Sequence, residues 1–309
     1  MSVHEGYALN EEVTTATASL KKAASLGVKT YTNPQLSHLP DKDAILIASF
    51  GTTYPKTRAN TIEAAVSDIA AAHPEAEVRL AFTSHMIISR IKKREGISYP
   101  TPEEALDTLL QEGYTRVALV SFDCIPGLEY DYKAEVFHQY KYRFKKMTLG
   151  LPLMYWMGQE EKRDDIIEVL TAVQKQIPDV QEQQAVLLMA HGTPHPANAY
   201  YAVLQDRLEA MNLPHTYVYS VEGSPHLEDI LPKLKAASVK KVLLMPLMMV
   251  AGDHACNDMA GDEDDSHKRI LEKEGYQVAV YLKGLGENPD IRRIITARAD
   301  EAVQALQEN

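Results

Sequence analysis

The feature that most constrains this chain is a regular alternation of short apolar runs with amphipathic helix patterns. The first run, Ala44 to Phe50, ends at Gly51, and a helix pattern follows from Thr57 to Ala72. Further strands are expected near 77–83, 116–122, 147–153, 184–190, 215–221, 241–248 and 277–282, and helices near 102–112, 129–143, 159–176, 197–211, 225–237, 265–274 and 289–306. Near-continuous apolar strands alternating with helices predict an α/β fold with parallel sheets covered on both faces.

The chain also repeats itself. The stretch SFGTT at Ser49–Thr53 corresponds to AHGTP at Ala190–Pro194, because each follows an apolar run and precedes a helix pattern. Further on, SFDCIPGLE at Ser121–Glu129 corresponds to PLMMVAGDH at Pro246–His254. The repeat predicts two similar doubly wound domains whose strand ends face each other across an interdomain cleft.

The alternation and the repeat divide the chain into three segments. Residues 1–41 do not fit the alternation, and we expect an N-terminal extension there, with one helix from Asn10 to Ser25, packed on the surface or partly mobile. Residues 42–157 form the expected N-terminal α/β domain. Residues 158–309 form the expected C-terminal α/β domain, with a last helix able to pack back on the first domain.

Composition excludes several classes of protein. The formal net charge of −11 and the scattered lysines and arginines argue against a nucleic-acid surface. The longest apolar stretch, Val242 to Ala251, is too short to span a bilayer, and the N-terminus lacks a signal-peptide pattern. We therefore expect a cytoplasmic protein, or a periplasmic one if a signal peptide has been removed. The two cysteines, Cys124 and Cys256, imply no disulfide framework.

Two histidines stand where apolar runs stop. His191 follows the run Leu187–Ala190, and His254 follows the run Leu243–Val250 with only a short loop between. Either histidine alone is equally well explained as a loop residue or a helix cap. Glu222, however, ends a third expected strand between them. Two imidazoles and a carboxylate that meet at one edge of a sheet form a set of ligands suited to a divalent transition metal such as iron, cobalt, nickel or zinc.

Five stretches of the sequence together carry a resemblance to a known family. They are ILIASFGTTYPKTR, LVSFDCIPGLEYD, LMAHGTPHPAN, VEGSP and PLMMVAGDHACNDMAGDEDDSHK, within residues 43–306. The chain resembles the anaerobic sirohydrochlorin cobaltochelatases, the CbiK type of class II chelatase. The resemblance implies a bilobal enzyme that inserts Co²⁺ into sirohydrochlorin without ATP during cobalamin synthesis. It also implies that His191 and His254 hold the metal and that Glu222 is the glutamate of the family. The extension over residues 1–41 departs from the family pattern.

The chemistry of this reaction suits such a site. Insertion removes two pyrrole N–H protons while a cation loses its water, and neutral histidines can serve as ligands and as bases. Glu222 either lowers the cost of bringing in the cation or accepts a proton. Candidate contacts for the tetrapyrrole and its carboxylates are Gly51, Thr52, Thr53, Gly127, Gly192 and Thr193, most of them at expected helix N-termini. Ile125, Met248 and Met249 are candidates for an apolar shelf under the macrocycle.

Other motifs have simpler explanations beside the functional ones. Cys256 is either a third soft ligand or a small buried side chain, and His85 either faces the cleft or is an ordinary surface residue. The acidic cluster Asp262–Asp265 either collects cations or is a solvated helix N-terminus. Gly284-Leu285-Gly286 resembles a dinucleotide-binding loop but lacks its third glycine, so we expect no nucleotide cofactor.

Alternatives to a cobalt chelatase stay open at this point. Ni²⁺ and Fe²⁺ suit the same ligands as Co²⁺, and the sequence leaves a homo-oligomer open. Two α/β lobes around a cleft also describe a metal-binding or haem-binding carrier or receptor without catalysis. A zinc hydrolase lacks support, because no HExxH motif occurs in the sequence.

Overall fold

A computed structural model describes residues 9–10, 12–177 and 182–308, and it contains two sheets. The first sheet has the strand order β1-β5-β4-β2-β3. Its strands β5, β4, β2 and β3 are parallel to one another. Its strands are β1 (Lys29–Thr32), β2 (Asp43–Ser49), β3 (Glu77–Phe82), β4 (Arg116–Ser121) and β5 (Lys146–Leu149). The bounds of β2, β3 and β4 agree with the apolar runs to within one residue, whereas β5 ends at Leu149 and not near 153 as expected. The predicted α/β class with parallel sheets is confirmed.

The second sheet repeats the topology of the parallel part of the first. Its order is β7-β6-β8-β9, and all its pairs are parallel. Its strands are β6 (Gln184–Ala190), β7 (Thr216–Ser220), β8 (Lys241–Pro246) and β9 (Gln277–Val280). In each sheet the first parallel strand lies between the second and the third, so β2, β3, β4 and β5 correspond to β6, β7, β8 and β9. The structure therefore supports the internal repeat read from the sequence.

Helices cover the sheets. The α-helices are α1 (Ala18–Ala23), α2 (Pro55–Arg58), α3 (Ala64–Ala72), α4 (His85–Glu95), α5 (Pro102–Gln111), α6 (Leu128–Tyr140), α7 (Asp165–Gln174), α8 (Tyr200–Ala210), α9 (Leu227–Ala236), α10 (His267–Lys273) and α11 (Pro289–Gln307). The short 3₁₀ and π segments are η1 (Pro34–Leu36), η2 (Ala59–Glu63), η3 (Lys141–Arg143), η4 (Pro196–Ala199), η5 (Ala255–Met259) and η6 (Leu285–Glu287). Only α4 has no counterpart among the predicted helices.

The apolar core passes without interruption from one sheet to the other. On one face of the first sheet, Leu46 and Leu119 pack with residues of α5 and α6. On the opposite face, Ile47 belongs to a cluster that also contains Leu188 of the second sheet. We call the first sheet with its helices the first lobe and the second sheet with its helices the second lobe. Their shared core fixes how the two lobes sit relative to each other.

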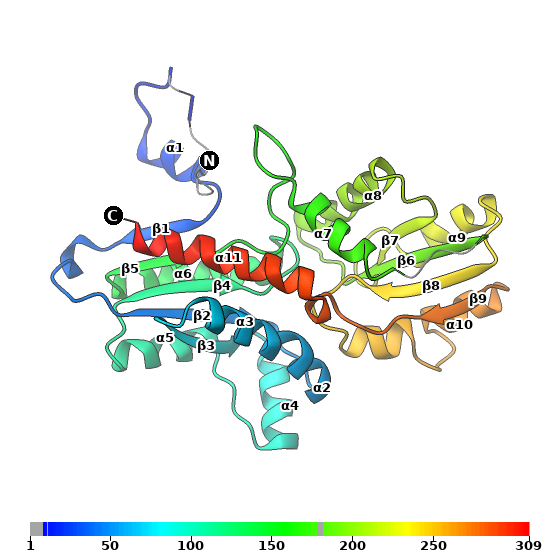
Figure 1. Cartoon of the computed structure of the whole chain (residues 1–309), viewed down its shortest axis with the longest axis horizontal. Coiled ribbons are helices and arrows are strands. Elements are labelled where there is room, and N and C mark those ends of the chain that lie inside the picture. Colours follow the sequence, from blue (N-terminus) through cyan, green and yellow to red (C-terminus); the bar gives the residue numbers. More distant parts are fainter. Residues whose placement is uncertain (1–8, 11, 178–181, 309) are drawn as a thin grey trace.

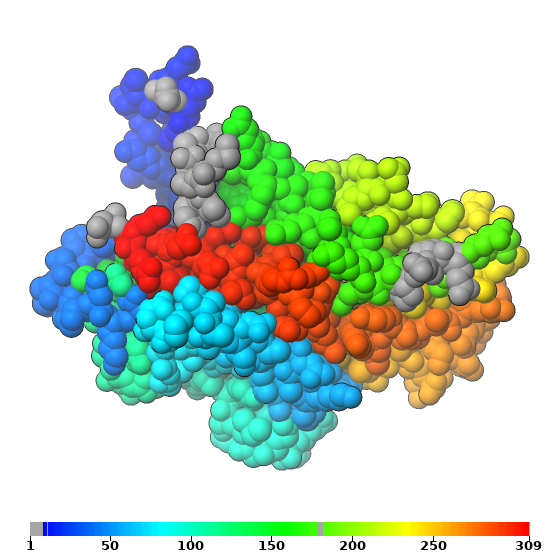
Figure 2. Space-filling model, in the orientation of Figure 1, coloured from blue at the N-terminus to red at the C-terminus, as the bar shows by residue number. Residues whose placement is uncertain are grey.

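The last helix returns to the first lobe. After β9, the chain runs back and α11 packs against β4, β5 and α3, as Figure 1 shows for the long red helix. In the space-filling view, α11 lies between α3 and the segment around α7 (Figure 2). Arg298 of α11 is buried and donates to Asp165 at 2.9 Å, and Asp165 is itself completely buried. This ion pair joins the end of the chain to the segment that connects the two lobes.

The N-terminal segment is more integrated than the sequence suggests. Only Ala18–Ala23 of the expected Asn10–Ser25 helix is helical, and residue 11 of that range lies outside the described residues. β1 pairs antiparallel with β5, with Thr30 opposite Thr148. The first sheet is thus mixed at one edge, and part of the expected extension belongs to the sheet. Within the described residues, no helix is both long enough and apolar enough to cross a membrane.

Candidate metal centre

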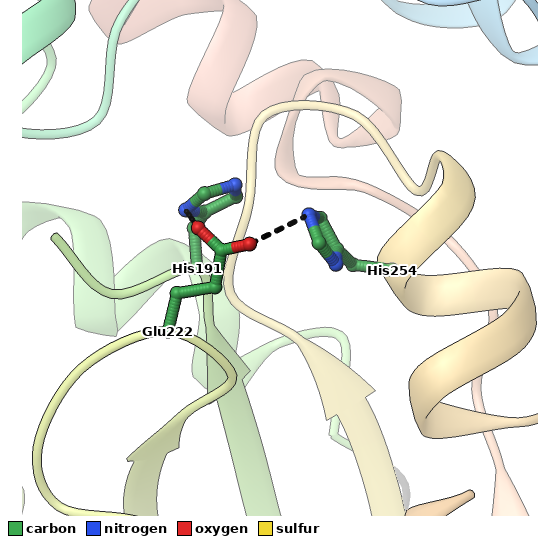
Figure 3. A group of neighbouring side chains, drawn as sticks. All are labelled: His191, Glu222 and His254. Atoms are coloured by element: carbon green, nitrogen blue, oxygen red, sulfur yellow. Dashed lines mark ion pairs between the residues drawn. The ribbon is translucent and has the colours of Figure 1, made fainter.

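Three side chains from three neighbouring strand ends converge in the second lobe, as Figure 3 shows. His191 directly follows β6, Glu222 follows β7, and His254 lies in the turn after β8. One potential ligand atom from each residue lies within 4.8 Å of the others. Glu222 Oε2 is 3.9 Å from His191 Nδ1, and Glu222 Oε1 is 3.9 Å from His254 Nε2. The structure thus brings together the three residues that the sequence singled out as metal ligands.

The place of this group in the fold is typical of a ligand site. β6 lies between β7 and β8, because the chain passes from β6 to β7 on one side and then crosses to β8 on the other. In open α/β sheets, ligands bind at the carboxyl ends of the strands where the strand order diverges in this way. The imidazole rings of His191 and His254 are perpendicular, with centroids 4.7 Å apart. All three side chains are accessible, from 31% for His254 to 56% for Glu222.

A glycine allows the loops of His191 and Glu222 to approach each other. Gly192 has a φ of +87°, and a Cβ there would lie 2.4 Å from the backbone nitrogen of Gly223. The backbone N–H of Glu222 donates to the carbonyl of His191 at 2.8 Å. The position therefore requires glycine both for its backbone conformation and for its contact with the neighbouring loop.

Hydrogen bonds assign the tautomers of both histidines. His191 Nδ1 lies 2.9 Å from the carbonyl oxygen of Gly192, which can only accept, so Nδ1 carries the proton. His254 Nδ1 lies 2.5 Å from Asp258 Oδ2, which assigns its proton in the same way. Each ring then keeps a free lone pair on Nε2. Ligand nitrogens about 2.1 Å from a tetrahedral metal are about 3.4 Å apart, so modest inward movement lets the group close on an ion.

The first lobe has the same pairing of parallel strands as the second lobe, but different side chains follow its strands. Ser49 pairs with Phe82 in the first sheet as Ala190 pairs with Ser220 in the second, and Ala48 pairs with Ser121 as Met189 pairs with Pro246. Counting onward from these pairs, the residues at the positions of His191, Glu222 and His254 are, in that order, Phe50, Ser84 and Glu129. His85 is the exposed residue next to Ser84 and is not part of the metal-binding group. The first lobe thus carries an apolar ring where the second carries its first histidine.

The loop after β2 touches the turn that carries His254. Thr52 Oγ1 lies 3.6 Å from the position that a Cβ on Gly252 would take. The Tyr54 hydroxyl donates to Asp253 Oδ1 at 3.3 Å. Residues of the first lobe therefore lie beside the metal-binding group.

The candidate tetrapyrrole contacts have mixed outcomes. The backbone N–H groups of four of them already have partners within the protein, namely Gly51, Gly127, Gly192 and Thr193. Thr52 is buried and Thr53 is half-buried, and both stay predictions as anion contacts. The expected apolar shelf is wrong, because Ile125, Met248 and Met249 face the core and are at most 9% exposed. Large exposed apolar side chains stand instead on the first lobe, at Phe50, Met86 and Leu128.

The remaining motifs take structural roles. Cys256 lies outside the metal-binding group, and burial raises the pKa of its thiol. Cys124 is buried more deeply, which raises its pKa to about 12. Two members of the acidic cluster pair with lysines, Asp262 with Lys268 at 3.3 Å and Asp264 with Lys273 at 3.0 Å.

The glycine pair at 284 and 286 also packs within the protein. A Cβ on Gly284 would lie 2.7 Å from the carbonyl oxygen of Met249, and one on Gly286 would lie 3.1 Å from the same oxygen. Close packing against the backbone of the second lobe accounts for both glycines.

Comparison with known proteins agrees with this geometry. A family model described as "Cobalt chelatase (CbiK)" matches residues 43–304. The chain belongs to this family. The sirohydrochlorin cobaltochelatase of Salmonella typhimurium is 38% identical over 262 residues, which cover 85% of this chain and 97% of the relative. The sirohydrochlorin cobaltochelatase CbiKC of Nitratidesulfovibrio vulgaris is 35% identical over 277 residues, 87% of this chain and 94% of the relative. The resemblance seen in the sequence is confirmed.

Solved chelatases of the same fold are more distant in sequence. SirB from Bacillus subtilis with Fe³⁺ has a TM-score of 0.58 at 15% identity, covering 84% of this chain and 95% of that chain. The sirohydrochlorin chelatase SirB from Bacillus subtilis subspecies spizizenii in complex with cobalt has a TM-score of 0.55 at 15% identity, covering 85% and 96%. These likenesses show that this chain shares the fold of SirB.

The sequence analysis did not predict a role for Asp258 in this group. Asp258 lies one helical turn after His254 and bonds to that ring. The spacing of the two residues in the sequence could have revealed it, since residues four apart on a helix are neighbours.

Proposed function

We propose that this protein inserts Co²⁺ into sirohydrochlorin without a nucleotide, with His191, Glu222 and His254 holding the metal. The single observation that carries the proposal is the convergence of these three side chains at the carboxyl ends of β6, β7 and β8. Membership of the cobalt chelatase family supports the choice of metal and reaction. Nothing in the structure favours a carrier without catalysis.

The reaction exchanges one cation for two protons. Co²⁺ leaves its water ligands for the Nε2 lone pairs of His191 and His254 and for a carboxylate oxygen of Glu222. It then passes to the four nitrogens of the macrocycle, and the two inner N–H groups lose their protons. The imidazoles can accept those protons as the metal leaves them, because both the metal and the proton bind the same lone pairs. The products are the cobalt tetrapyrrole and two protons, so the exchange balances without a further reactant.

Glu222 has two candidate roles in this scheme. Its carboxylate lies 3.9 Å from the unprotonated Nε2 of His254 and 3.9 Å from Nδ1 of the His191 ring, which suits a third metal ligand beside the two imidazoles. It also suits an acceptor for a pyrrole proton. Glu222→Gln keeps the size and one acceptor oxygen and removes the charge. A ligand role predicts weaker binding of Co²⁺ by the free protein, whereas a role in proton transfer alone predicts unchanged binding and slower insertion.

The macrocycle lies, in this proposal, against apolar side chains of the first lobe. Phe50 is 43% exposed and occupies the position that corresponds to His191. Leu128 is 59% exposed at the start of α6, one turn before Asp131, which pairs with His195 of the second lobe at 3.1 Å. Met86 is 53% exposed at the start of α4. These side chains can cover the apolar face of a tetrapyrrole whose centre meets the metal held by the second lobe.

The assay uses purified protein, sirohydrochlorin and Co²⁺ in the absence of nucleotide, with Fe²⁺ and Ni²⁺ as alternative metals. The proposal predicts a change in the tetrapyrrole absorption spectrum over many turnovers, whereas a carrier stops at one equivalent. His191→Ala and His254→Ala should each remove most of the activity and leave the fold intact, because both side chains are substantially exposed. Normal turnover by both folded variants would refute the assignment.

We also propose a cytoplasmic location, which cell fractionation tests. The oligomeric state is open to measurement of the molar mass in solution.

A further inference from the structure

We propose that Asp258 is a positioning residue of the metal centre, which holds the His254 ring so that Nε2 faces the metal. The inference rests on the function proposed above for the three ligands. Asp258 Oδ2 lies 2.5 Å from His254 Nδ1, and the opposite nitrogen of the ring, Nε2, is the one nearest to Glu222. A carboxylate on one nitrogen of a histidine fixes the tautomer and the direction of the other nitrogen.

The backbone around this pair is firmly anchored. His254 precedes the π-helical segment η5, whose first and last residues, Ala255 and Met259, are completely buried. Single π-helical turns are frequently found at functional sites. Gly261 closes the turn, where a Cβ would lie 2.4 Å from the carbonyl oxygen of Asn257. The distance between His254 and Asp258 is therefore set by the turn itself.

The two histidines are oriented by different means. His191 Nδ1 bonds to the carbonyl of the next residue, Gly192, at 2.9 Å, so its own backbone orients it. His254 relies on a charged side chain that can be replaced without altering the backbone. A carboxylate partner also strengthens an imidazole as a metal ligand. The effect of Asp258 should therefore appear in the binding of the metal.

The corresponding residue of the first lobe shows that a carboxylate is not required by the fold at this position. Counting from the paired strands, Lys133 stands where Asp258 stands, and Glu129 stands where His254 stands. Lys133 is completely buried and pairs with Asp123 at 2.7 Å. Asp258 is 47% exposed, so its hydrogen bond to the ring contributes little to the stability of the fold. The carboxylate is present in the lobe that has the histidine to orient.

The test measures Co²⁺ binding by the full chain without tetrapyrrole, by competition with a metal indicator and by the absorption spectrum of bound Co²⁺. The variants are Asp258→Ala, Asp258→Asn and the control Asp262→Asn. Asp262 is 96% exposed and pairs with Lys268, and its replacement by asparagine removes the same charge as Asp258→Asn does. Sirohydrochlorin binding is followed separately by its fluorescence, and thermal unfolding checks that each variant is folded.

We expect Asp258→Ala to weaken Co²⁺ binding about 10–100-fold and to alter the spectrum of the bound metal. Asp258→Asn should lose less affinity for Co²⁺, because its amide oxygen still accepts a hydrogen bond from Nδ1–H of His254. Asp262→Asn should bind Co²⁺ as tightly as the wild type does. Sirohydrochlorin binding should stay unchanged in all three variants. The proposal is overturned if Asp258→Ala binds Co²⁺ normally, if Asp262→Asn weakens Co²⁺ binding as much as Asp258→Ala does, or if tetrapyrrole binding falls in parallel. A wild type that binds Co²⁺ and does not insert it would refute the proposed function alone.

Discussion

Replacing Gly192 by alanine should impair the metal centre far more than it impairs the fold. The new Cβ would lie 2.4 Å from Gly223 N and 2.5 Å from the carbonyl carbon of Glu222, where ordinary contact begins at 3.4 Å. The two loops must therefore separate by about 1 Å, and a displacement of that size at a reacting centre can cost about 100-fold in rate. Because the two loops carry His191 and Glu222, the separation opens the group of ligands.

A second glycine supplies the control. Gly275 has a φ of +92°, close to the +87° of Gly192, and nothing lies within 4 Å of a Cβ added there. Gly275→Ala should thus cost the same backbone strain, on the order of 1–2 kcal/mol, without moving a ligand.

The assay is cobalt insertion followed by absorbance, together with the thermal unfolding midpoint of each variant. We expect about 100-fold slower insertion for Gly192→Ala and nearly normal insertion for Gly275→Ala, with both variants folded. Equal activities in the two folded variants would show that the contact between the loops does not position the ligands.

Two further predictions concern the first lobe and the response to acid. Phe50→Ala should raise the KM for sirohydrochlorin and leave Co²⁺ binding intact, and an unchanged KM would remove Phe50 from the macrocycle surface. Burial lowers the pKa of His267, whose Nδ1 lies 3.0 Å from the Tyr219 hydroxyl. The unfolded chain, with a histidine pKa of about 6.5, then takes up the proton first, so this stability contribution is present above that pH and is lost as the pH falls below it. His267→Gln should therefore flatten the fall of the unfolding midpoint between about pH 7.5 and about pH 5.5, and an unaltered slope would contradict the assignment.

The ligands could be predicted from the sequence because each directly follows or closely trails an apolar strand. His191, Glu222 and His254 lie at the ends of β6, β7 and β8, and parallel strands bring their carboxyl ends to one edge. The prediction of an apolar shelf was wrong for a related reason. An apolar residue near a strand end, such as Met248, has the same sequence signal whether it faces the core or the ligand, and here it faces the core.

The elements that escaped prediction have weak apolar signals. α4 is charged over most of its second half, with Ile87 and Ile91 as its buried residues, and it begins at a cap where Ser84 Oγ accepts from the N–H of Ile87. β1 has only four residues with alternating burial, and its place beside β5 depends on a partner far along the chain. Such pairing follows from tertiary contacts, which a local pattern does not contain.

The return of α11 to the first lobe affects the order in which the protein is built during translation. Domains usually fold as units, the N-terminal one first, while the ribosome still makes the rest. Here β4 and β5 receive their covering helix from Pro289–Gln307, at the end of the chain. The first lobe therefore exposes the part of its sheet around β4 and β5 until α11 has been synthesised. A nascent chain stalled before Pro289 should consequently be a better target for chaperones and proteases than the finished protein.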